Sequence, residues 1–214
     1  MPVEVFDYRT DIRNFFIAPE MRARVIRREP GTAGDGHTHD LGHEIFLILE
    51  GQAEIIVEGE SAILGPGQMC IARADQWHQI KVVGDQPLIY YLSVTPHLEP
   101  THTQWDHPGG NKLPYKYGAS TRDERRARTE PPEAPDTLLS RHLAASHALV
   151  DAARANATAQ EAAAADLRSA LDAGNKDAAK EAIDAMWRSF YATYKDIQAM
   201  EVAWNELAPA VAGE

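Results

Sequence analysis

The sequence predicts a mainly β fold, an antiparallel barrel or sandwich, followed by a C-terminal α-helical hairpin. Residues 20–96 are rich in branched and aromatic side chains and are punctuated by glycine, which is typical of short strands. Residues 136–214 hold 24 alanines, which favours helices. Several prolines lie between the two regions. We therefore expect a β domain over residues 1–96, a linker over 97–135 and a helical hairpin over 136–214.

Seven short segments of the first region carry the β-branched and aromatic residues expected of strands, and turn residues separate them. Several strands at such regular spacing indicate a sandwich or a barrel. The Glu58-Gly59-Glu60 stretch between two apolar runs predicts a tight hairpin. The expected strands are Met21–Arg28, Glu44–Glu50, Ala53–Glu58, Ser61–Leu64, Gln68–Ala72, His78–Val83 and Leu88–Thr95.

The linker is rich in proline and contains the charge run Arg122–Arg128. A loop of this length without its own structure is usually functional or disordered. Three of its histidines, His97, His102 and His107, lie near prolines. We expect them to be solvated loop residues, and a second metal site built from them is the less favoured alternative.

The helical region predicts two helices separated at Gly174. Asp136 is a plausible N-cap of the first helix, and Gly174 a plausible stop. Asn175 is placed to cap the second helix, which we expect to end near Leu207, before Pro209.

Large side chains recur along the second helix at spacings of three and four, which is typical of a helix-packing seam. The first helix offers mostly alanine, so a hairpin on its own would bury little apolar area. We expect it to pack on the β domain or, in a homodimer, to pair with a second hairpin as a four-helix bundle. The seam residues are Ile183, Trp187, Phe190, Tyr194, Ile197, Glu201 and Trp204.

The chemistry lies in a cluster of histidines and one glutamate. His37 and His39 are two apart on an extended segment, so their side chains point the same way. A turn before Glu44 lets its carboxylate return to the imidazoles, and His78 begins a later strand. Imidazoles and a carboxylate suit a divalent first-row metal, and two positions of an octahedral ion would stay open. We expect one such ion, Fe, Mn, Ni or Zn.

This spacing resembles the cupin superfamily. The first cupin motif has a glycine, five residues, His-x-His, three or four residues, Glu, six residues and Gly. The chain matches it at Gly31, His37, His39, Glu44 and Gly51. The resemblance covers about residues 20–96 and implies a small antiparallel jelly-roll barrel with a metal between its sheets. It implies nothing about the helical region.

The second cupin motif is matched less completely. Gly67 and His78 stand at the right distance from each other. Arg73 replaces the usual proline, Asp75 the usual glycine and Val82 the usual asparagine. These departures leave the ligand in place but change the turn and the pocket wall.

His43 is the alternative to Glu44 as a metal ligand, under the shorter spacing that the first motif allows. We prefer Glu44, because the motif fits with glutamate as its oxygen donor. If Glu44 faces the interior, the neighbouring His43 faces the opposite side of the strand. It is then an outward residue or one that orients a ligand.

Five further residues are candidates for the pocket wall. Phe46 shares the inward face of its strand with Glu44. Arg73 and Trp77 flank the last ligand, and Arg73 can pair with an anionic group of a substrate. Tyr90 and Tyr91 are adjacent on one strand, so one faces inward and the other outward.

Composition excludes several classes of partner. The net charge is −11, and residues 121–214 hold 11 Lys and Arg against 16 Asp and Glu, so we expect neither nucleic-acid nor membrane binding. Cys70 is the single cysteine, which excludes an intrachain disulfide. We see no signal peptide and no apolar run long enough to span a membrane, and we expect a cytoplasmic protein.

The predicted function is that of a metal-dependent cupin enzyme acting on a small oxygen-bearing metabolite, with dioxygenase-like oxidoreductases the leading class. Cupins also include isomerases, decarboxylases, lyases and plain binding proteins, so the fold does not select among them. The alternatives are therefore one of those other enzymes or a non-catalytic metabolite sensor. No catalytic residue is assigned beyond the metal ligands.

Overall fold

The computed structural model describes residues 2–213, which divide into two compact units. The first contains residues 2–131 together with residues 208–213, and the second contains residues 132–207. Within the described residues, no helix combines the length and apolarity that crossing a bilayer requires.

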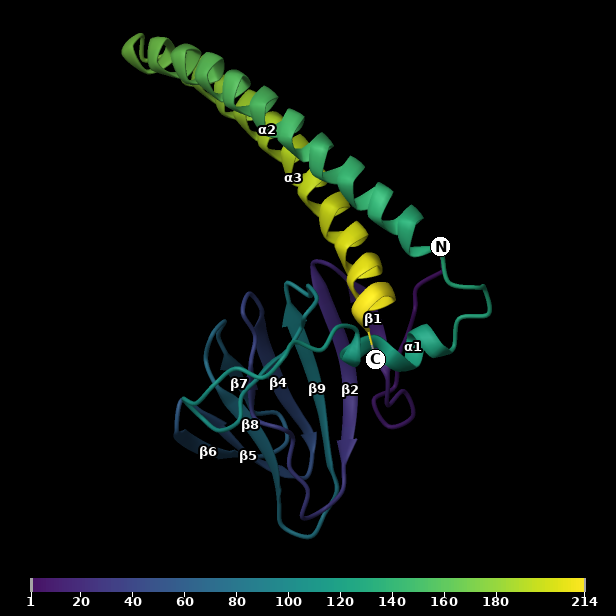
Figure 1. The fold of residues 1–214 in the computed structure, drawn as a ribbon. Helices are drawn as coiled ribbons and strands as arrows, with labels where there is room; N and C mark the ends of the chain where they lie inside the picture. Colours follow the sequence, from purple (N-terminus) through teal and green to yellow (C-terminus); the bar gives the residue numbers. More distant parts are fainter. Residues whose placement is uncertain (1, 214) are drawn as a thin grey trace. The chain divides into compact units, whose positions relative to one another are not determined.

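The first unit is a β structure of two antiparallel five-stranded sheets (Figure 1). One sheet has the order β1-β2-β9-β4-β7, and the other has the order β10-β3-β8-β5-β6. The sheets face each other as a jelly-roll sandwich and do not close into a barrel. The strands are β1 (Asn14–Ala18), β2 (Met21–Arg28), β3 (His37–Thr38), β4 (His43–Glu50), β5 (Gln52–Val57), β6 (Glu60–Leu64), β7 (Met69–Ala72), β8 (His78–Val83), β9 (Leu88–Thr95) and β10 (Thr103–Gln104).

All seven strands expected from the sequence are present, three of them with the predicted bounds. The sequence did not predict β1 or β10, and it described the two residues of β3 only as an extended segment. β1 pairs with β2 at the edge of its sheet, and its burial does not alternate, so its apolar pattern is weak. β10 has only two residues, too few for a periodic signal.

The core lies between the two sheets, because alternate residues of each strand face inward. On β4 the inward residues include Phe46 and Ile48, and on β9 they include Leu88 and Tyr90. The remaining core residues are Ala53, Ile55, Leu64, Ala72, Ile80, Leu92 and Val94.

The segment expected to be a linker contributes to the first unit. Thr103 and Gln104 of β10 pair with β3 beside the histidines. The short helices η1 (Ala119–Thr121) and α1 (Arg122–Arg126) follow. The side-chain amide of Asn14 donates a hydrogen bond of 3.0 Å to the carbonyl oxygen of Ser120. These contacts fix residues 97–131 against the β structure.

The second unit is a helical hairpin of α2 (Pro135–Asp172) and of α3 (Lys176–Ala212) as far as Leu207, and the two helices run antiparallel (Figure 1). The N-cap of α2 is Ala134, with Pro135 in the first turn, so the expectation that Asp136 is the cap is wrong. Gly174 has φ of 65° and ends α2 as predicted. The side chain of Asn175 accepts a hydrogen bond of 3.1 Å from the backbone N–H of Ala178 and caps α3.

α3 extends past the expected end, to Ala212, with Pro209 inside its last turns. A proline removes one N–H donor, and near a helix terminus the turn tolerates that loss. Gly213 donates a backbone hydrogen bond of 3.0 Å to the carbonyl of Pro209 and closes the helix.

The two helices meet through small and polar side chains. Ala163, Ala170 and Ala182 are buried, and Gln160 donates a hydrogen bond of 2.8 Å to the carbonyl oxygen of Met186. Of the aromatic residues of the predicted seam, Trp204 does contact α2, because its ring lies 5.6 Å from that of His142, whereas the other three are largely exposed. Trp187, for example, is 59% exposed.

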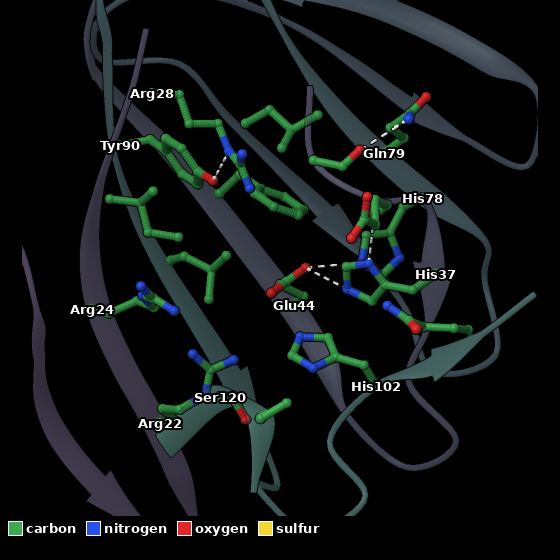
Figure 2. A pocket seen from close by; sticks show the side chains of 18 residues that line it. Arg22, Arg24, Arg28, His37, Glu44, His78, Gln79, Tyr90, His102 and Ser120 are labelled. Carbon is green, nitrogen blue, oxygen red and sulfur yellow. Dashed lines mark hydrogen bonds and ion pairs between the residues drawn. The ribbon is translucent and has the colours of Figure 1, made fainter. Parts of the chain in front are cut away.

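One end of the β core is polar and leaves a cavity of about 250 Å³ (Figure 2). Its walls come from both sheets, including β2, β4, β8 and β9. Four core residues also line the cavity, so the cavity adjoins the apolar core; they are Phe46, Ile80, Tyr90 and Leu92.

Candidate metal centre

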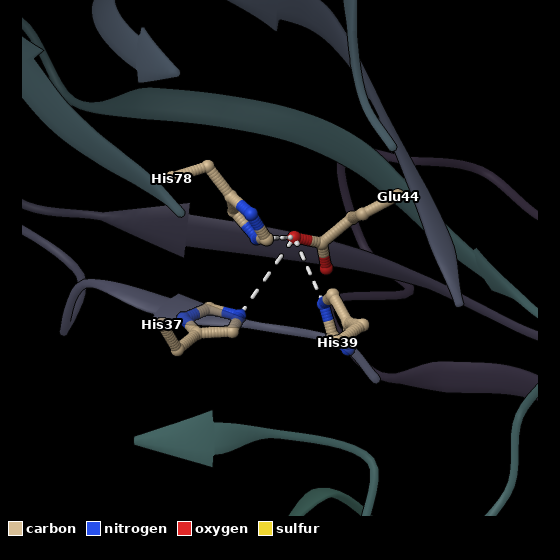
Figure 3. A group of neighbouring side chains, drawn as sticks. All are labelled: His37, His39, Glu44 and His78. Carbon is tan, nitrogen blue, oxygen red and sulfur yellow. Dashed lines mark hydrogen bonds and ion pairs between the residues drawn. The ribbon is translucent and has the colours of Figure 1, made fainter. Parts of the chain in front are cut away.

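Four side chains from both sheets converge at the cavity (Figure 3). His37 lies on β3 and pairs directly with His78 on β8, so these two imidazoles are cross-strand neighbours. His39 follows β3 with the same side-chain direction as His37. Glu44 reaches the cluster from β4 in the opposite sheet. The ligand atoms all lie within 4.8 Å of one another.

The second ring nitrogen of each histidine is held by the backbone. Nδ1 of His37 donates a hydrogen bond of 2.8 Å to the carbonyl oxygen of Asp35, and Nδ1 of His78 donates one of 2.9 Å to that of Gln76. Nδ1 of His39 donates to the carbonyl oxygen of Thr101. Since a carbonyl only accepts, Nδ1 carries the proton in all three, and a neutral ring then presents the Nε2 lone pair.

The three Nε2 atoms are directed at one oxygen of Glu44. The distances to Glu44 Oε2 are 3.9 Å from His37, 3.5 Å from His39 and 2.8 Å from His78. Glu44, His39 and His78 are each 1% exposed. Three of the four groups are therefore shielded from bulk water, and the side chain of His37 is 18% exposed.

Buried charge and hydrogen bonding set the ionisation of this cluster. Burial lowers the pKa of His37 to about 4, so this imidazole is neutral at physiological pH. Burial acts to raise the pKa of Glu44, but hydrogen bonds and positive charge from the imidazoles of His39 and His78, when these rings are protonated, outweigh burial and hold that pKa well below its usual value. The cluster thus combines a carboxylate with imidazole lone pairs.

These residues fit a divalent cation. Nε2 of His37 and of His39 is buried without a hydrogen-bond partner among residues 2–213. Lone pairs that face a carboxylate repel one another, and a cation between them removes the repulsion. Metal–ligand bonds of about 2.0–2.2 Å place neighbouring ligand atoms roughly 3 Å apart, close to the observed separations. Three imidazoles and a carboxylate suit Fe, Mn, Ni and Zn.

The cavity beside the cluster is lined by three of the four candidate ligands, His37, Glu44 and His78 (Figure 2). Phe46 and Tyr90, two of the five residues expected at the pocket wall, also line it. The Tyr90 hydroxyl accepts a hydrogen bond of 3.1 Å from Nε of Arg28, and burial raises the pKa of Tyr90.

His43 lies on the other side of β4 from Glu44. It is exposed, and its Nδ1 accepts a hydrogen bond of 2.9 Å from the backbone N–H of Ala74. The cause is the two-residue period of the strand, which turns His43 outward when Glu44 turns inward. His43 is therefore not part of the cluster.

Among the described residues, the cavity lining does not include Arg73, Trp77 or Tyr91. Arg73 is exposed in the turn after β7. The Trp77 ring lies over Gly36, where a Cβ would come within 2.0 Å of the ring. Tyr91 faces the opposite side of β9 from Tyr90, and its ring lies 6.2 Å from that of Phe15.

The cavity residues that the sequence reasoning missed include Arg22, Arg24, Arg28 and His102. The alternation of arginines along β2 was a usable signal, since residues 22, 24 and 28 share one face of a strand. The position of His102 depends on β10 pairing with β3, which no local pattern reveals.

The expectation that the linker histidines are solvated is wrong for two of the three. The His102 ring lies 4.5 Å from that of His37 and 5.0 Å from that of His39. Burial lowers the pKa of His102 well below its ordinary value. His97 is 2% exposed, and burial lowers its pKa to about 3. Only His107 of the three is exposed.

Comparison with known proteins identifies the β structure. The family model described as Cupin domain matches residues 24–95. Solved structures similar to this chain include TT1209 from Thermus thermophilus, with 23% identity over 44% of this chain and 98% of that chain and a TM-score of 0.42. Another is the DMSP lyase DddQ from Ruegeria pomeroyi, with 26% identity over 44% of this chain and 47% of that chain and a TM-score of 0.38. No curated protein matches the chain.

Proposed function

We propose, on the premise that residues 24–95 form a cupin domain, that this protein is a metal-dependent enzyme acting on a small oxygen-bearing metabolite, with a dioxygenase-like oxidoreductase activity. The observation that carries the proposal is the convergence of three Nε2 atoms on Glu44 at the wall of a cavity. A structural site is usually closed by its protein ligands, whereas this cluster borders an open space.

The residues of the chain hold and orient the reactants. His37, His39, Glu44 and His78 would bind one divalent ion, which when bound polarises an oxygen function or, if redox-active, activates dioxygen. The backbone carbonyls behind the three histidines fix their rings, so the ligand atoms are directed before the ion arrives.

The apolar part of the cavity wall serves to exclude water. The Phe46 ring lies 5.9 Å from that of His78, and Leu92 and Ile80 line the same cavity. A carbon skeleton packed against these side chains displaces water from the reacting atoms. The cavity of about 250 Å³ suits a small metabolite rather than a polymer.

The experiment that tests the proposal is metal identification followed by oxygen uptake. The ion in protein purified without added metal is identified by elemental analysis. The protein reconstituted with Fe(II) is then mixed with a panel of small oxygen-bearing metabolites in an oxygen electrode. We expect uptake with Fe(II) and none with Zn(II) or with His78→Ala.

A metal-loaded protein that consumes no oxygen but converts a metabolite would replace the oxidoreductase by an isomerase, a decarboxylase or a lyase. A metal-free protein that binds an organic ligand tightly would support the sensor instead.

We also propose that the protein is a homodimer joined through the helical hairpin. Trp187, Phe190 and Tyr194 form a continuous row of ring contacts on α3, with centroids 5.8 Å and 6.3 Å apart. All three rings are about half exposed in the single chain. A second hairpin packed on this row as a four-helix bundle would cover it.

A further inference from the structure

The cavity wall opposite the metal cluster is basic. β2 has the sequence Met21–Arg28, MRARVIRR, and the two-residue period of the strand places residues 22, 24, 26 and 28 on one face. Arg22, Arg24 and Arg28 of that face all line the cavity (Figure 2). We call these three residues the arginine row.

Two guanidiniums of the arginine row are incompletely partnered although they are inside the protein. Arg22 is 1% exposed, and Nη1 donates one long hydrogen bond of 3.4 Å to the side-chain oxygen of Asn14. Nε of Arg22 and Nε of Arg24 are buried without a hydrogen-bond partner within residues 2–213. The carboxylates of Glu44, Glu99 and Glu124 act on the charge of Arg22. The two Nε–H donors still lack an acceptor, and a buried donor without one is costly, so they favour an anionic acceptor in the cavity.

The net charge of the residues that line the cavity also favours an anionic ligand. The charged lining consists of the three arginines against Asp35 and Glu44, a sum of +1 before any metal binds. The whole chain carries −11. Burial lowers the pKa of Arg22 to about 10, which leaves it protonated at neutral pH. A divalent ion at the cluster makes the cavity still more positive.

The strand register relates the arginine row to the metal ligands. Arg22 and Glu44 both pair with Val94, one from each side, and Arg24 and Phe46 flank Leu92 in the same manner. Side chains in such a row face the same side of the sheet, and two strand spacings are about 9.6 Å. A short carbon chain therefore spans the distance from an arginine to the cluster.

We propose that the arginine row binds the carboxylate of a small anionic metabolite and directs the rest of the molecule to the metal cluster. This inference rests on the proposed function, because it names the substrate class of the same site. The guanidinium of Arg28 donates a hydrogen bond to Tyr90, and that of Arg22 donates one to Asn14. These contacts orient both guanidiniums before a ligand binds. Arg24, between them, has its Nε free for the ligand.

A carboxylate fits this wall better than a phosphate. Planar guanidinium forks match the two oxygens of a carboxylate, and the apolar side chains Ile26 and Leu92 beside them suit its carbon skeleton. Phosphate sites typically add a nest of backbone N–H groups or a helix N-terminus. The backbone of β2 is paired with β9 along residues 22–28 and with β1 along residues 21–24, so this wall presents mainly side chains. Ala119 and Ser120 of η1 line another part of the cavity.

The test is calorimetric titration with succinate, its neutral analogue succinamide, and inorganic phosphate. Each is titrated into the chelated protein and into the metal-loaded protein. We expect succinate to bind to both forms, and to bind at least tenfold more tightly than succinamide or phosphate. Arg24→Gln should weaken succinate binding by about 10- to 100-fold, which is the effect expected from losing a charge-assisted hydrogen bond. Arg24→Lys should restore part of the loss.

Arg27→Gln is the matched control. Arg27 lies on the same strand, but it is exposed on the other face and pairs with Glu29 at 2.9 Å. The Arg27→Gln variant should bind succinate as tightly as the wild type does. Equal weakening in Arg24→Gln and Arg27→Gln, or no preference for succinate over succinamide, would overturn the inference, as would tighter binding of phosphate. Circular dichroism and bound metal are measured on Arg24→Gln, and we expect both to match the wild type if the variant remains folded.

The two proposals fail separately. Succinate binding to a wild type that takes up no metal supports the arginine row and overturns the metal enzyme. Metal uptake without any succinate binding overturns the arginine row alone.

Discussion

Nε2 of His78 lies 2.8 Å from Oε2 of Glu44, and this contact joins the two sheets of the sandwich. His78 belongs to β8 in one sheet and Glu44 to β4 in the other. An ion bound at this point would therefore link the two sheets as well as take part in catalysis.

Removing a ligand should remove the ion. His37→Ala, His39→Ala and His78→Ala should each lower bound metal strongly, because each deletes one of four donor atoms while the core stays packed. Elemental analysis of the purified variants measures the stoichiometry. His43→Ala is the control and should bind as much metal as the wild type, since His43 is outside the cluster. Unchanged stoichiometry in the three variants, or a larger loss in His43→Ala than in Glu44→Ala, would contradict the ligand set.

Metal should stabilise the fold. At a free metal concentration a thousand times Kd, binding adds about 4 kcal/mol to the free energy of unfolding. We expect chelation to lower Tm by several degrees and metal to restore it, measured by differential scanning calorimetry. His78→Ala should melt at the same temperature with and without metal. A wild type whose Tm does not respond to metal would contradict a site that joins the sheets.

Gly51 should not tolerate a side chain. It has φ of 75°, and a Cβ there would lie 2.5 Å from the carbonyl oxygen of Pro87. Gly51→Ala combines backbone strain with this clash and should lower the free energy of unfolding by about 2–4 kcal/mol in a urea titration. Gly59 has φ of 85° and open space around it, so Gly59→Ala isolates the strain and should cost about 1 kcal/mol. Equal costs would show that the contact with Pro87 is irrelevant.

The exposed aromatic row of α3 should control assembly. The double variant Trp187→Ser, Phe190→Ser should convert a dimer into a monomer, seen as half the particle mass by light scattering, because it removes two large apolar contacts. Ile63 on β6 is also exposed, and Ile63→Ser should leave the mass unchanged. A wild type that is monomeric, or a double variant of unaltered mass, would refute the proposed dimer.

The sequence predicted what local patterns encode. β-Branched and aromatic residues between turn residues defined β2, β8 and β9, and the spacing of His37, His39, Glu44 and His78 led to the cluster that the structure brings together. The period of two also separated Glu44 from His43.

What the sequence did not predict depends on pairing between distant segments. His102 reaches the cluster because residues 103 and 104 pair with 38 and 37, across more than sixty positions. The exclusion of Trp77 from the cavity depends on its packing over Gly36. Neither relationship leaves a periodic trace in the chain, so residue-level patterns did not reveal the full cavity wall.

The imidazole orientations depend on main-chain acceptors, at Asp35, Gln76 and Thr101. Every amino acid supplies the same carbonyl oxygen, so exchange of those three side chains leaves the coordinating nitrogen unchanged. Substitutions around the histidines can therefore change the entrance and the selectivity of this cavity during evolution, while the backbone hydrogen bonds that orient the imidazoles remain.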